Sequence, residues 1–281
     1  MRPLLETRQV TKRFGDLVAV DSVTLRVHPG EIVGLIGANG AGKTTLIRLI
    51  LGLLPPTAGR IDLFGAPPRP EARARVGYVP QTTGSYLDLT VAENLRFVAA
   101  AFGTTPPVLD PELRAVADRP LGELPLGIRR KVAFAAAVCH HPDLLILDEP
   151  TSGVGPLGRV ELWGAIGEVA ARGAGVLVTT HHMEEAEQCD RIVLLSAGRV
   201  VADGTPAEVT GHVTAVEVSA PQWEPVFRRL REAGFRPLLA GSRLRVAGVD
   251  ADEITRLAGP GADVRPTSPT LEEAFVALVS R

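Results

Sequence analysis

The stretch that decides the fold is GANGAGKTT, residues 37–45. It satisfies the pattern G-x-x-x-x-G-K-[ST], follows an apolar run typical of a buried strand, and precedes a pattern typical of a helix. Its glycines let the backbone curl without Cβ clashes, so that several N–H groups can point at phosphate oxygens. The following helix adds the positive end of its dipole. This context favours a polyphosphate-binding loop over a plain glycine-rich turn.

The residues of this loop have separate expected roles. We expect Lys43 to reach the β and γ phosphates of a nucleotide, and the Thr44 hydroxyl to bind Mg²⁺. The remaining residues expected to surround the phosphates are Gly37, Ala38, Asn39, Gly40, Ala41, Gly42 and Thr45.

The run LLILDEP, residues 144–150, supplies the matching half of such a site. A fully apolar run predicts a strand that is buried on both faces, and ligands gather at the carboxyl ends of parallel strands. We therefore expect Asp148 at the metal and Glu149 beside the γ-phosphate, where it can orient or deprotonate a water. The alternative is a strand that ends in a capping aspartate, but the presence of the phosphate loop favours the metal site.

Buried-strand patterns alternate with helical patterns along the chain. The apolar runs of strand length are Ile32–Ile36, Leu144–Leu147, Val176–Thr180 and Ile192–Leu195. Their alternation with helices predicts an α/β fold with a parallel sheet and right-handed crossovers. Near the N-terminus, TRQVTKRF and SVTLRV alternate apolar and polar residues, which predicts an antiparallel β layer packed on the main sheet.

The pattern changes after about residue 211. The segments that follow predict a small β-α-β-β-α-β-α unit, and no catalytic motif is apparent in it. We therefore expect a nucleotide-binding domain in residues 1–211. We expect a small α+β domain with a regulatory or dimerising role in residues 212–281.

Composition disfavours several other classes of protein. The 281 residues are 45% hydrophobic and 22% charged with a net charge of -2, which gives no general attraction to nucleic acid. Cys139 and Cys189 lie far apart, without the spacing of a disulfide scaffold or zinc site. The N-terminus lacks the apolar core of a signal peptide, and no stretch approaches 18 uninterrupted apolar residues. We therefore expect a cytoplasmic chain that does not itself span a membrane.

The order of these motifs resembles that of the ATP-binding cassette (ABC) ATPases over about residues 5–210. The resemblance implies a P-loop NTPase fold with a RecA-like parallel-sheet core, an antiparallel β layer and a helical subdomain at about residues 82–142. It implies ATP and Mg²⁺ as cofactors. It also implies that Phe14, in VTKRFG, stacks on adenine, although a core phenylalanine is the alternative.

Two further motifs of the family are matched. The resemblance implies that Gln81, in GYVPQ, senses Mg²⁺ and the attacking water, and that His181, in VLVTTHH, contacts the γ-phosphate. A surface histidine at the end of a strand is the alternative for His181. The implied catalytic residues are Glu149, His181, Gln81 and Lys43, and the implied metal-site residues are Thr44, Gln81 and Asp148.

ELPLGIRRKV, residues 123–132, falls where the family has its signature, usually LSGGQ. In the family, two nucleotide-binding domains enclose two ATP molecules, each between one P-loop and the signature of the opposite domain. Here Pro125 and Leu126 replace the serine and the first glycine, which leaves Gly127 as the implied nucleotide contact. Proline has neither a hydroxyl nor an N–H to donate, but it suits the first turn of a helix expected from Ile128.

Other features of the signature region also bear on activity. We expect the basic residues after the signature to face solvent, with added positive potential at the phosphate as the alternative; they are Arg129, Arg130 and Lys131. PTSGVGP, residues 150–156, has Gly155 where the family has the aspartate of its D-loop. These departures predict a composite site of low activity, or one that depends on a partner chain with a better signature.

The LPLG and PTSGVGP forms, together with PTLEEAFVALV at residues 269–279, resemble ABC-2-type multidrug and antibiotic exporters. The resemblance implies an ATP-hydrolysing subunit that powers export of a drug, antibiotic or similar hydrophobic cargo. The implied partners are an ABC-2-type membrane permease and a second nucleotide-binding domain, in a homodimer or heterodimer. The implied location is the inner face of the cell membrane, through that permease. The alternatives are a soluble ABC ATPase not tied to transport, and a low-turnover regulatory partner in a heterodimer.

Overall fold

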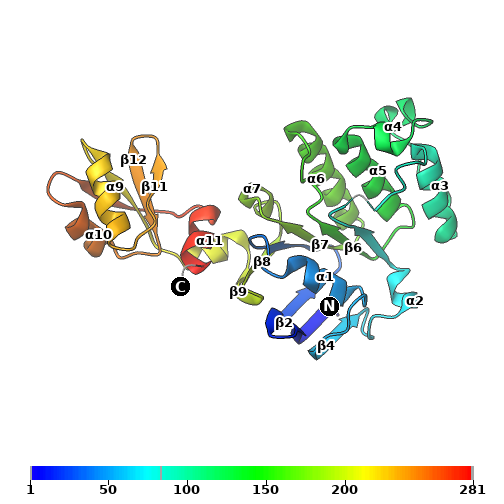
Figure 1. The fold of residues 1–281 in the computed structure, drawn as a ribbon, viewed down its shortest axis with the longest axis horizontal. Coiled ribbons are helices and arrows are strands. Elements are labelled where there is room, and N and C mark those ends of the chain that lie inside the picture. Colours follow the sequence, from blue (N-terminus) through cyan, green and yellow to red (C-terminus); the bar gives the residue numbers. More distant parts are fainter. Residues whose placement is uncertain (1, 83, 280–281) are drawn as a thin grey trace. The chain divides into compact units, whose positions relative to one another are not determined.

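The computed structural model describes residues 2–82 and 84–279, which form two compact units (Figure 1). The division lies between Val200 and Val201, whereas the sequence patterns placed it after residue 211. Strand β9 (Arg199–Gly204) spans this division. Its neighbour in the sheet, β8 (Arg191–Ser196), lies in the first unit. A boundary after residue 211, as the sequence patterns suggest, assigns both β8 and β9 to the first unit.

Within the described residues, the first unit is built on a six-stranded sheet in the order β5-β6-β7-β3-β8-β9. Its other strands are β3 (Ile32–Ile36), β5 (Val76–Val79), β6 (Leu144–Asp148), β7 (Gly175–Thr180) and β8 (Arg191–Ser196). Neighbouring strands from β5 to β8 pair in parallel, and β6 and β7 are buried along their whole length. The four apolar runs are thus confirmed as strands of a parallel sheet.

Along the chain, helices alternate with these strands. They are α1 (Lys43–Ile50), α2 (Pro70–Arg73), α3 (Val91–Ala101), α4 (Pro111–Ala115), α5 (Leu126–Val138), α6 (Pro156–Ala171) and α7 (Met183–Ala186). Helix α3 begins at a capping box, in which Thr90 and Glu93 satisfy each other's backbone N–H. Helices α3, α4 and α5 share an apolar cluster formed by Val91, Leu95, Leu113, Leu121, Leu124 and Val132. This separate cluster supports a helical subdomain in this segment.

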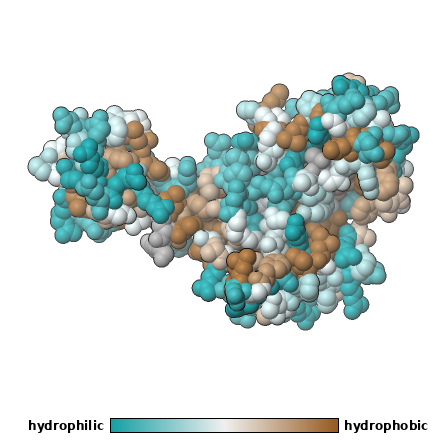
Figure 2. Space-filling model, in the orientation of Figure 1, coloured by the Kyte–Doolittle hydropathy of each residue, from teal (hydrophilic) through white to brown (hydrophobic). Residues whose placement is uncertain are grey.

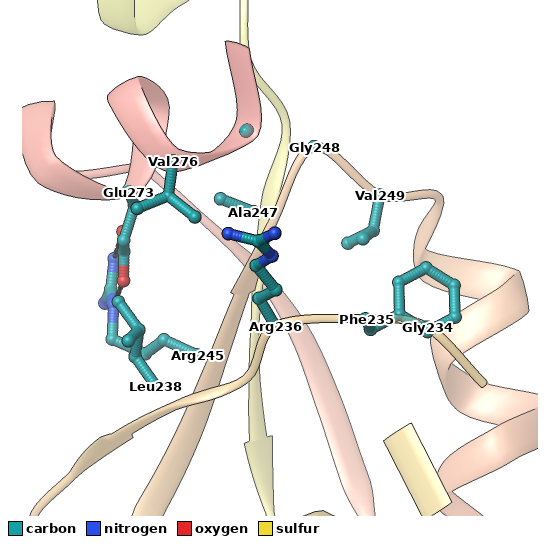
Figure 3. A pocket seen from close by; sticks show the side chains of 11 residues that line it. Gly234, Phe235, Arg236, Leu238, Arg245, Ala247, Gly248, Val249, Glu273 and Val276 are labelled. Carbon is teal, nitrogen blue, oxygen red and sulfur yellow. Dashed lines mark hydrogen bonds and ion pairs between the residues drawn. The ribbon is translucent and has the colours of Figure 1, made fainter. Parts of the chain in front are cut away.

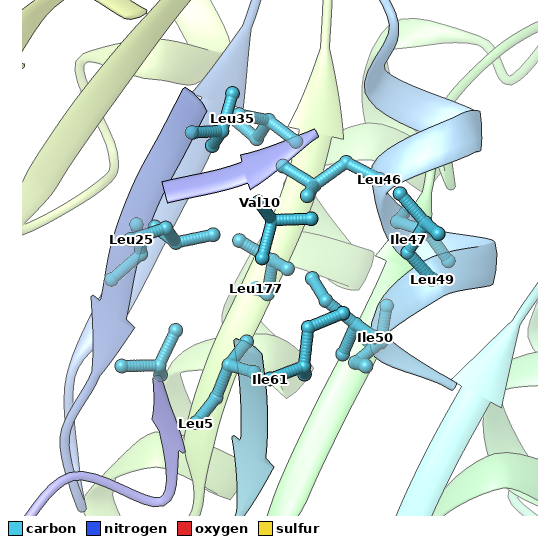
Figure 4. Packing of buried hydrophobic residues seen from close by; sticks show 14 of the residues in the cluster. Leu5, Val10, Leu25, Leu35, Leu46, Ile47, Leu49, Ile50, Ile61 and Leu177 are labelled. Atoms are coloured by element: carbon cyan, nitrogen blue, oxygen red, sulfur yellow. The ribbon is translucent and has the colours of Figure 1, made fainter. Parts of the chain in front are cut away.

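The antiparallel layer predicted near the N-terminus is confirmed as the sheet β2-β1-β4. Its strands are β1 (Leu5–Phe14), β2 (Leu17–Val27) and β4 (Ala58–Leu63). Figure 4 shows side chains of this layer, of α1 and of the parallel sheet in one cluster, among them Leu5, Val10, Leu25, Ile61, Leu46, Ile47, Leu49, Ile50, Leu35 and Leu177. Burying each leucine or isoleucine contributes about 1.5–3 kcal/mol. The cluster therefore fixes α1, and the loop before it, against both sheets.

The described part of the second unit contains an antiparallel four-stranded sheet in the order β11-β12-β10-β13. Its elements are α8 (Pro206–Gly211), β10 (Ala215–Ser219), α9 (Trp223–Glu232), β11 (Leu238–Ala240), β12 (Arg243–Ala247), α10 (Ala251–Ala258), β13 (Asp263–Thr267) and α11 (Leu271–Val279). From β10 onward, the predicted order β-α-β-β-α-β-α is confirmed, and it begins with a ferredoxin-like arrangement. Strand and helix side chains form one core, which includes Val216, Val218, Leu244, Val246, Val226, Leu230 and Ile254.

The C-terminal helix α11 is joined to β12 by a buried ion pair (Figure 3). Arg245 Nε lies 2.6 Å from Glu273 Oε1, and Glu273 is only 4% exposed. The backbone N–H of Thr270 also donates to this carboxylate, at 2.8 Å. Burial alone would raise the pKa of Glu273, but the hydrogen bonds from Arg245 and Thr270 outweigh burial and hold the pKa below its ordinary value. The pair lies at a small cavity of about 170 Å³.

Candidate functional site

The loop that carries the deciding motif connects β3 to α1, as the sequence predicts. Gly40 and Gly42 have φ of 82° and 105°, in the left-handed region that favours glycine. A Cβ at Gly42 would lie 2.4 Å from the carbonyl oxygen of Ala19, and one at Gly37 would lie 2.4 Å from that of Leu195. The tight approach of neighbouring backbone therefore requires glycine at both ends of the loop.

Lys43, the first residue of α1, is held inside the loop. It is 6% exposed, and its ammonium donates to the carbonyl oxygens of Gly37 at 2.7 Å and Ala38 at 3.2 Å. The same Nζ lies 3.6 Å from Oε1 of Glu149. A buried lysine between loop carbonyls and a carboxylate is positioned to meet an anionic group that enters the loop.

Thr44 and Asp148 bring two oxygen ligands together. The Thr44 hydroxyl donates to Asp148 Oδ2 at 3.0 Å, and the Thr179 hydroxyl donates to Oδ1 at 2.7 Å. Across the part of the chain that the structure describes, no group of three His, Cys, Asp or Glu side chains could form a complete metal cage. A hydroxyl and one carboxylate instead suit Mg²⁺, which keeps several waters and takes further oxygens from substrate phosphates.

The carboxylate of Glu149 is the point at which the expected residues converge. Gln81 Nε2 donates to Oε2 at 3.3 Å, while His181 Nδ1 lies 3.4 Å and Lys43 Nζ 3.6 Å from Oε1. Glu149 follows β6, His181 follows β7 and Gln81 comes shortly after β5, so parallel neighbours deliver all three to one edge of the sheet. This arrangement can hold a water beside a phosphate and accept a proton from it.

The backbone of Glu149 is unusual. Its φ is 49°, which is rare for a residue with a side chain and costs about 1–3 kcal/mol. The strained residue is held from β7, because its backbone N–H donates to Thr179 Oγ1 at 2.9 Å. Strain that the surrounding structure maintains is typical of functional positions.

Next to the loop lies a cavity of about 550 Å³, large enough for a nucleotide base and sugar. Phe14 forms part of its wall and is 47% exposed, so it is not a core side chain. The predicted residues that line the cavity are Phe14, Asn39, Gly40, Ala41, Gly42, Lys43, Thr44, Thr45, Gln81 and Glu149. Asp148 and His181 contact lining residues without lining the cavity, and Gly127 does not line it. Gly37 and Ala38 do not line it either, but both accept hydrogen bonds from Lys43.

The signature segment differs in part from expectation. Helix α5 begins at Leu126 rather than at Ile128, and Pro125 is its N-cap, without a side-chain hydrogen bond. A Cβ on Gly153 would lie 2.5 Å from Cδ2 of Leu126, so the Leu126 side chain lies directly against the turn after β6. A Cβ on Gly127 would have no neighbour within 4 Å, so the space beside this half-buried glycine is open.

The expectation that Arg130 faces solvent is wrong. Arg130 is 6% exposed, and it donates to the carbonyl oxygens of Pro80 at 3.2 Å and Gln81 at 2.6 Å. Burial lowers the pKa of the Arg130 guanidinium, while the charges of Asp148 and Glu149 oppose this shift. Arg130 therefore joins α5 to the segment that carries Gln81, a role that the sequence analysis missed.

The neighbours of Arg130 are also engaged with the protein. Arg129 is partly buried and donates to two backbone carbonyls of the turn before α5. Lys131 pairs with Glu112 of α4 and with Glu161 of α6. The signal that could have identified Arg130 is its spacing of four residues from the buried Phe134, which places both on one face of α5.

Comparison with known proteins gives these motifs a family. The ABC transporter family profile matches residues 20–152. A Nod factor export ATP-binding protein I of Burkholderia pseudomallei is 38% identical over 99% of this chain and 97% of its own length. The chain belongs to the ABC transporter ATP-binding proteins. As an ABC protein it is an ATPase, and the fold expected from its motifs is confirmed.

Two other similarities agree. A probable multidrug ABC transporter ATP-binding protein of Escherichia coli, YbhF, is 40% identical over 81% of this ABC protein. The chain spans only 41% of the length of that relative. A solved structure of an ATP-binding subunit of an ABC transporter is 36% identical with a TM-score of 0.69, and the match covers 74% of this chain and 92% of that one.

Proposed function

We propose that this ABC ATPase powers the export of a hydrophobic cargo such as a drug or antibiotic, together with a separate membrane permease of ABC-2 type. The single observation that carries the proposal is the convergence of Lys43, Gln81 and His181 on Glu149 beside a phosphate loop. The export role is supported by the relatives, which are named for multidrug transport and Nod factor export.

In the proposed reaction, the loop amides and Lys43 bind the ATP phosphates. Thr44, Asp148 and Gln81 would hold Mg²⁺, and the ion would neutralise charge on the phosphates. Glu149 accepts the proton of the attacking water, and His181 orients the Glu149 carboxylate through Oε1. Phe14 offers its exposed ring to the adenine.

A second nucleotide-binding domain completes the proposed site. Gly127, beside which the space is open, and the N-terminus of α5 would contact the phosphate of the other domain. Pro125 supplies no hydroxyl there and Gly155 no carboxylate, so a composite site formed by two copies of this chain would turn over slowly. A heterodimer with a partner that has a complete signature is the second candidate arrangement.

An exposed apolar patch supports contact with the membrane permease. Figure 2 shows hydrophobic side chains at the surface over the helices of the first unit. Tyr86, Leu87 and Phe97 are 52%, 48% and 51% exposed, and the rings of Tyr86 and Phe97 stack edge to face at 5.1 Å. Every helix within residues 2–82 and 84–279 is too short or too polar to cross a bilayer. The permease would thus hold this chain at the inner face of the cell membrane.

Co-purification tests the proposal. The chain is expressed with candidate membrane proteins of its own genome, each carrying a tag, and any complex is isolated through that tag. We expect stoichiometric recovery of the wild-type chain, reduced recovery of a Tyr86→Ala/Phe97→Ala variant, and ATP hydrolysis that responds to hydrophobic cargo in vesicles. Failure to associate with any membrane protein, combined with unaltered hydrolysis in vesicles, would contradict the transport role.

A further inference from the structure

Glu185 is a buried carboxylate to which no motif assigns a role. It lies on the short helix α7 and is 1% exposed. Its Oε1 accepts from the Thr151 hydroxyl at 2.6 Å, and its Oε2 accepts from the Thr180 hydroxyl at 2.7 Å. Arg159 Nε lies 3.3 Å from Oε1, so the buried charge has a cationic partner. A carboxylate removed from water is tolerated only with such a set of partners.

Thr151 belongs to the turn that follows Glu149. In this turn the Ser152 N–H donates to the Glu149 carbonyl at 3.2 Å, and the Val154 N–H donates to the Thr151 carbonyl at 2.9 Å. The Thr151 side chain is therefore fixed two residues beyond the strained Glu149, and its hydroxyl faces Glu185.

Thr180 immediately precedes His181. The Thr180 hydroxyl donates to Glu185 and also accepts from the His182 backbone N–H at 3.0 Å. This second hydrogen bond fixes the backbone on either side of His181. One carboxylate oxygen of Glu185 therefore anchors the turn after Glu149, and the other anchors the segment that carries His181. The side chains of Glu149 and His181 meet at Oε1 of Glu149.

We propose that Glu185 is a positioning residue for ATP hydrolysis, whose carboxylate sets the separation of His181 from Glu149. The inference rests on the roles proposed above for Glu149 and His181. A displacement of about 1 Å at a reacting group can slow a reaction by about 100-fold, so an anchor of this kind controls rate without touching the nucleotide. Glu185 does not line the cavity beside the phosphate loop.

The direct test is Glu185→Gln in the full chain with Mg-ATP. The amide keeps the size of the side chain, but it loses the charge and cannot accept from both hydroxyls with a fixed orientation. We expect kcat to fall about 10-fold or more, while KM and the affinity for a fluorescent ATP analogue change less than about twofold. The imidazole NMR signals of His181 should shift in this variant. The matched control is Glu187→Gln, because Glu187 is exposed and lies two residues from Glu185, and it should resemble the wild type.

A double variant separates positioning from plain structural support. If Glu185 acts through His181, the rate of His181→Ala/Glu185→Gln should equal that of His181→Ala. Multiplied losses, an unchanged kcat for Glu185→Gln, or a loss confined to KM would overturn the proposal. Should Glu185→Gln fail to fold, Thr180→Val replaces it: this variant should lose rate, and Thr180→Ser, which restores the hydroxyl, should regain it.

The same set of proteins separates the two proposals. A wild type that hydrolyses ATP, with His181→Ala slow and Glu185→Gln unchanged, would reject the role of Glu185 alone. A His181→Ala variant as fast as the wild type would reject the proposed site and, with it, the reason for the anchor.

Discussion

Glu149 combines two properties that seldom occur together in one residue. Its backbone occupies the left-handed region, and its carboxylate receives groups from three separate segments. The backbone N–H of Glu149 donates to Thr179 Oγ1, so the turn is held against β7. Gln81 and His181 follow strands on either side of β6, and Lys43 begins the helix after β3, so the order of the sheet brings all three to one carboxylate.

The nearby lysine provides the first prediction. Replacing Lys43 with alanine removes a charge-assisted contact to phosphate, so the affinity for ATP should fall about 10- to 100-fold. Titration with a fluorescent ATP analogue measures this, and Lys131→Ala is the control because Lys131 does not line the cavity. Equal affinity in Lys43→Ala and the wild type would remove Lys43 from the phosphate site.

Local motifs account for most of the site, and buried charges account for what was missed. Lys43 and Asp148 could be located because each belongs to a motif with a fixed spacing from its strand. The partners of Arg130 and Glu185 could not be located, because they are distant in sequence: Arg130 donates to Gln81, 49 residues away, and Glu185 accepts from Thr151, 34 residues away. The choice of such partners depends on tertiary contacts that no local pattern contains.

At the scale of elements, the structure differs from the sequence-based predictions mainly in where elements begin and how strands pair. Strand β6 can be predicted without tertiary information, because its sequence is a nearly continuous apolar run. Every residue in it is buried, as that run predicts. The start of α5 was placed two residues late because Leu126, in a segment read as a signature turn, is helical. The order of elements in the second unit could be predicted, but the pairing of β10 with both β12 and β13 could not, since strands that alternate in pattern do not specify their neighbours.

The stability of the C-terminal helix α11 should decrease at acidic pH. The pKa of Glu273 is lowered in the folded chain, so its stabilising contribution is present above its unfolded pKa of about 4.3 and is lost as pH falls through the lower folded value. Glu273→Gln leaves Arg245 without its partner and should destabilise the chain by about 3 kcal/mol at pH 7.

Denaturant unfolding and hydrogen exchange of α11, measured from pH 7 to pH 3, check this expectation. The stability difference between the wild type and Glu273→Gln should shrink below about pH 4.3. A difference that stays constant over this range would show that the ion pair does not support α11.

At the scale of the whole molecule, the proposed function makes the chain a motor subunit whose contribution to a site shared with a second domain is altered. The residues that we propose for the phosphate loop and the metal site lie together, and Glu149 lies beside them. The surface that it would offer to a second domain has Pro125 at the helix N-cap and Leu126 against Gly153. We therefore expect the signature, rather than the residues around Glu149, to limit turnover in a homodimer.

Restoring the hydroxyl tests this expectation. Pro125→Ser returns a hydroxyl and an N–H at the N-terminus of α5, and kcat of the homodimer should rise about 10-fold. Pro125→Ala returns the N–H without the hydroxyl and serves as the matched control. If steady-state hydrolysis is the same in all three proteins, the signature does not limit turnover.

The most direct test of the central claim is the behaviour of Glu149→Gln with ATP. The account predicts that this variant binds Mg-ATP with the affinity of the wild type and retains it intact, because the loop and Lys43 are untouched. Single-turnover hydrolysis should be about 100-fold slower or more, since the group that accepts the proton of water is gone. Hydrolysis at the wild-type rate would contradict the account.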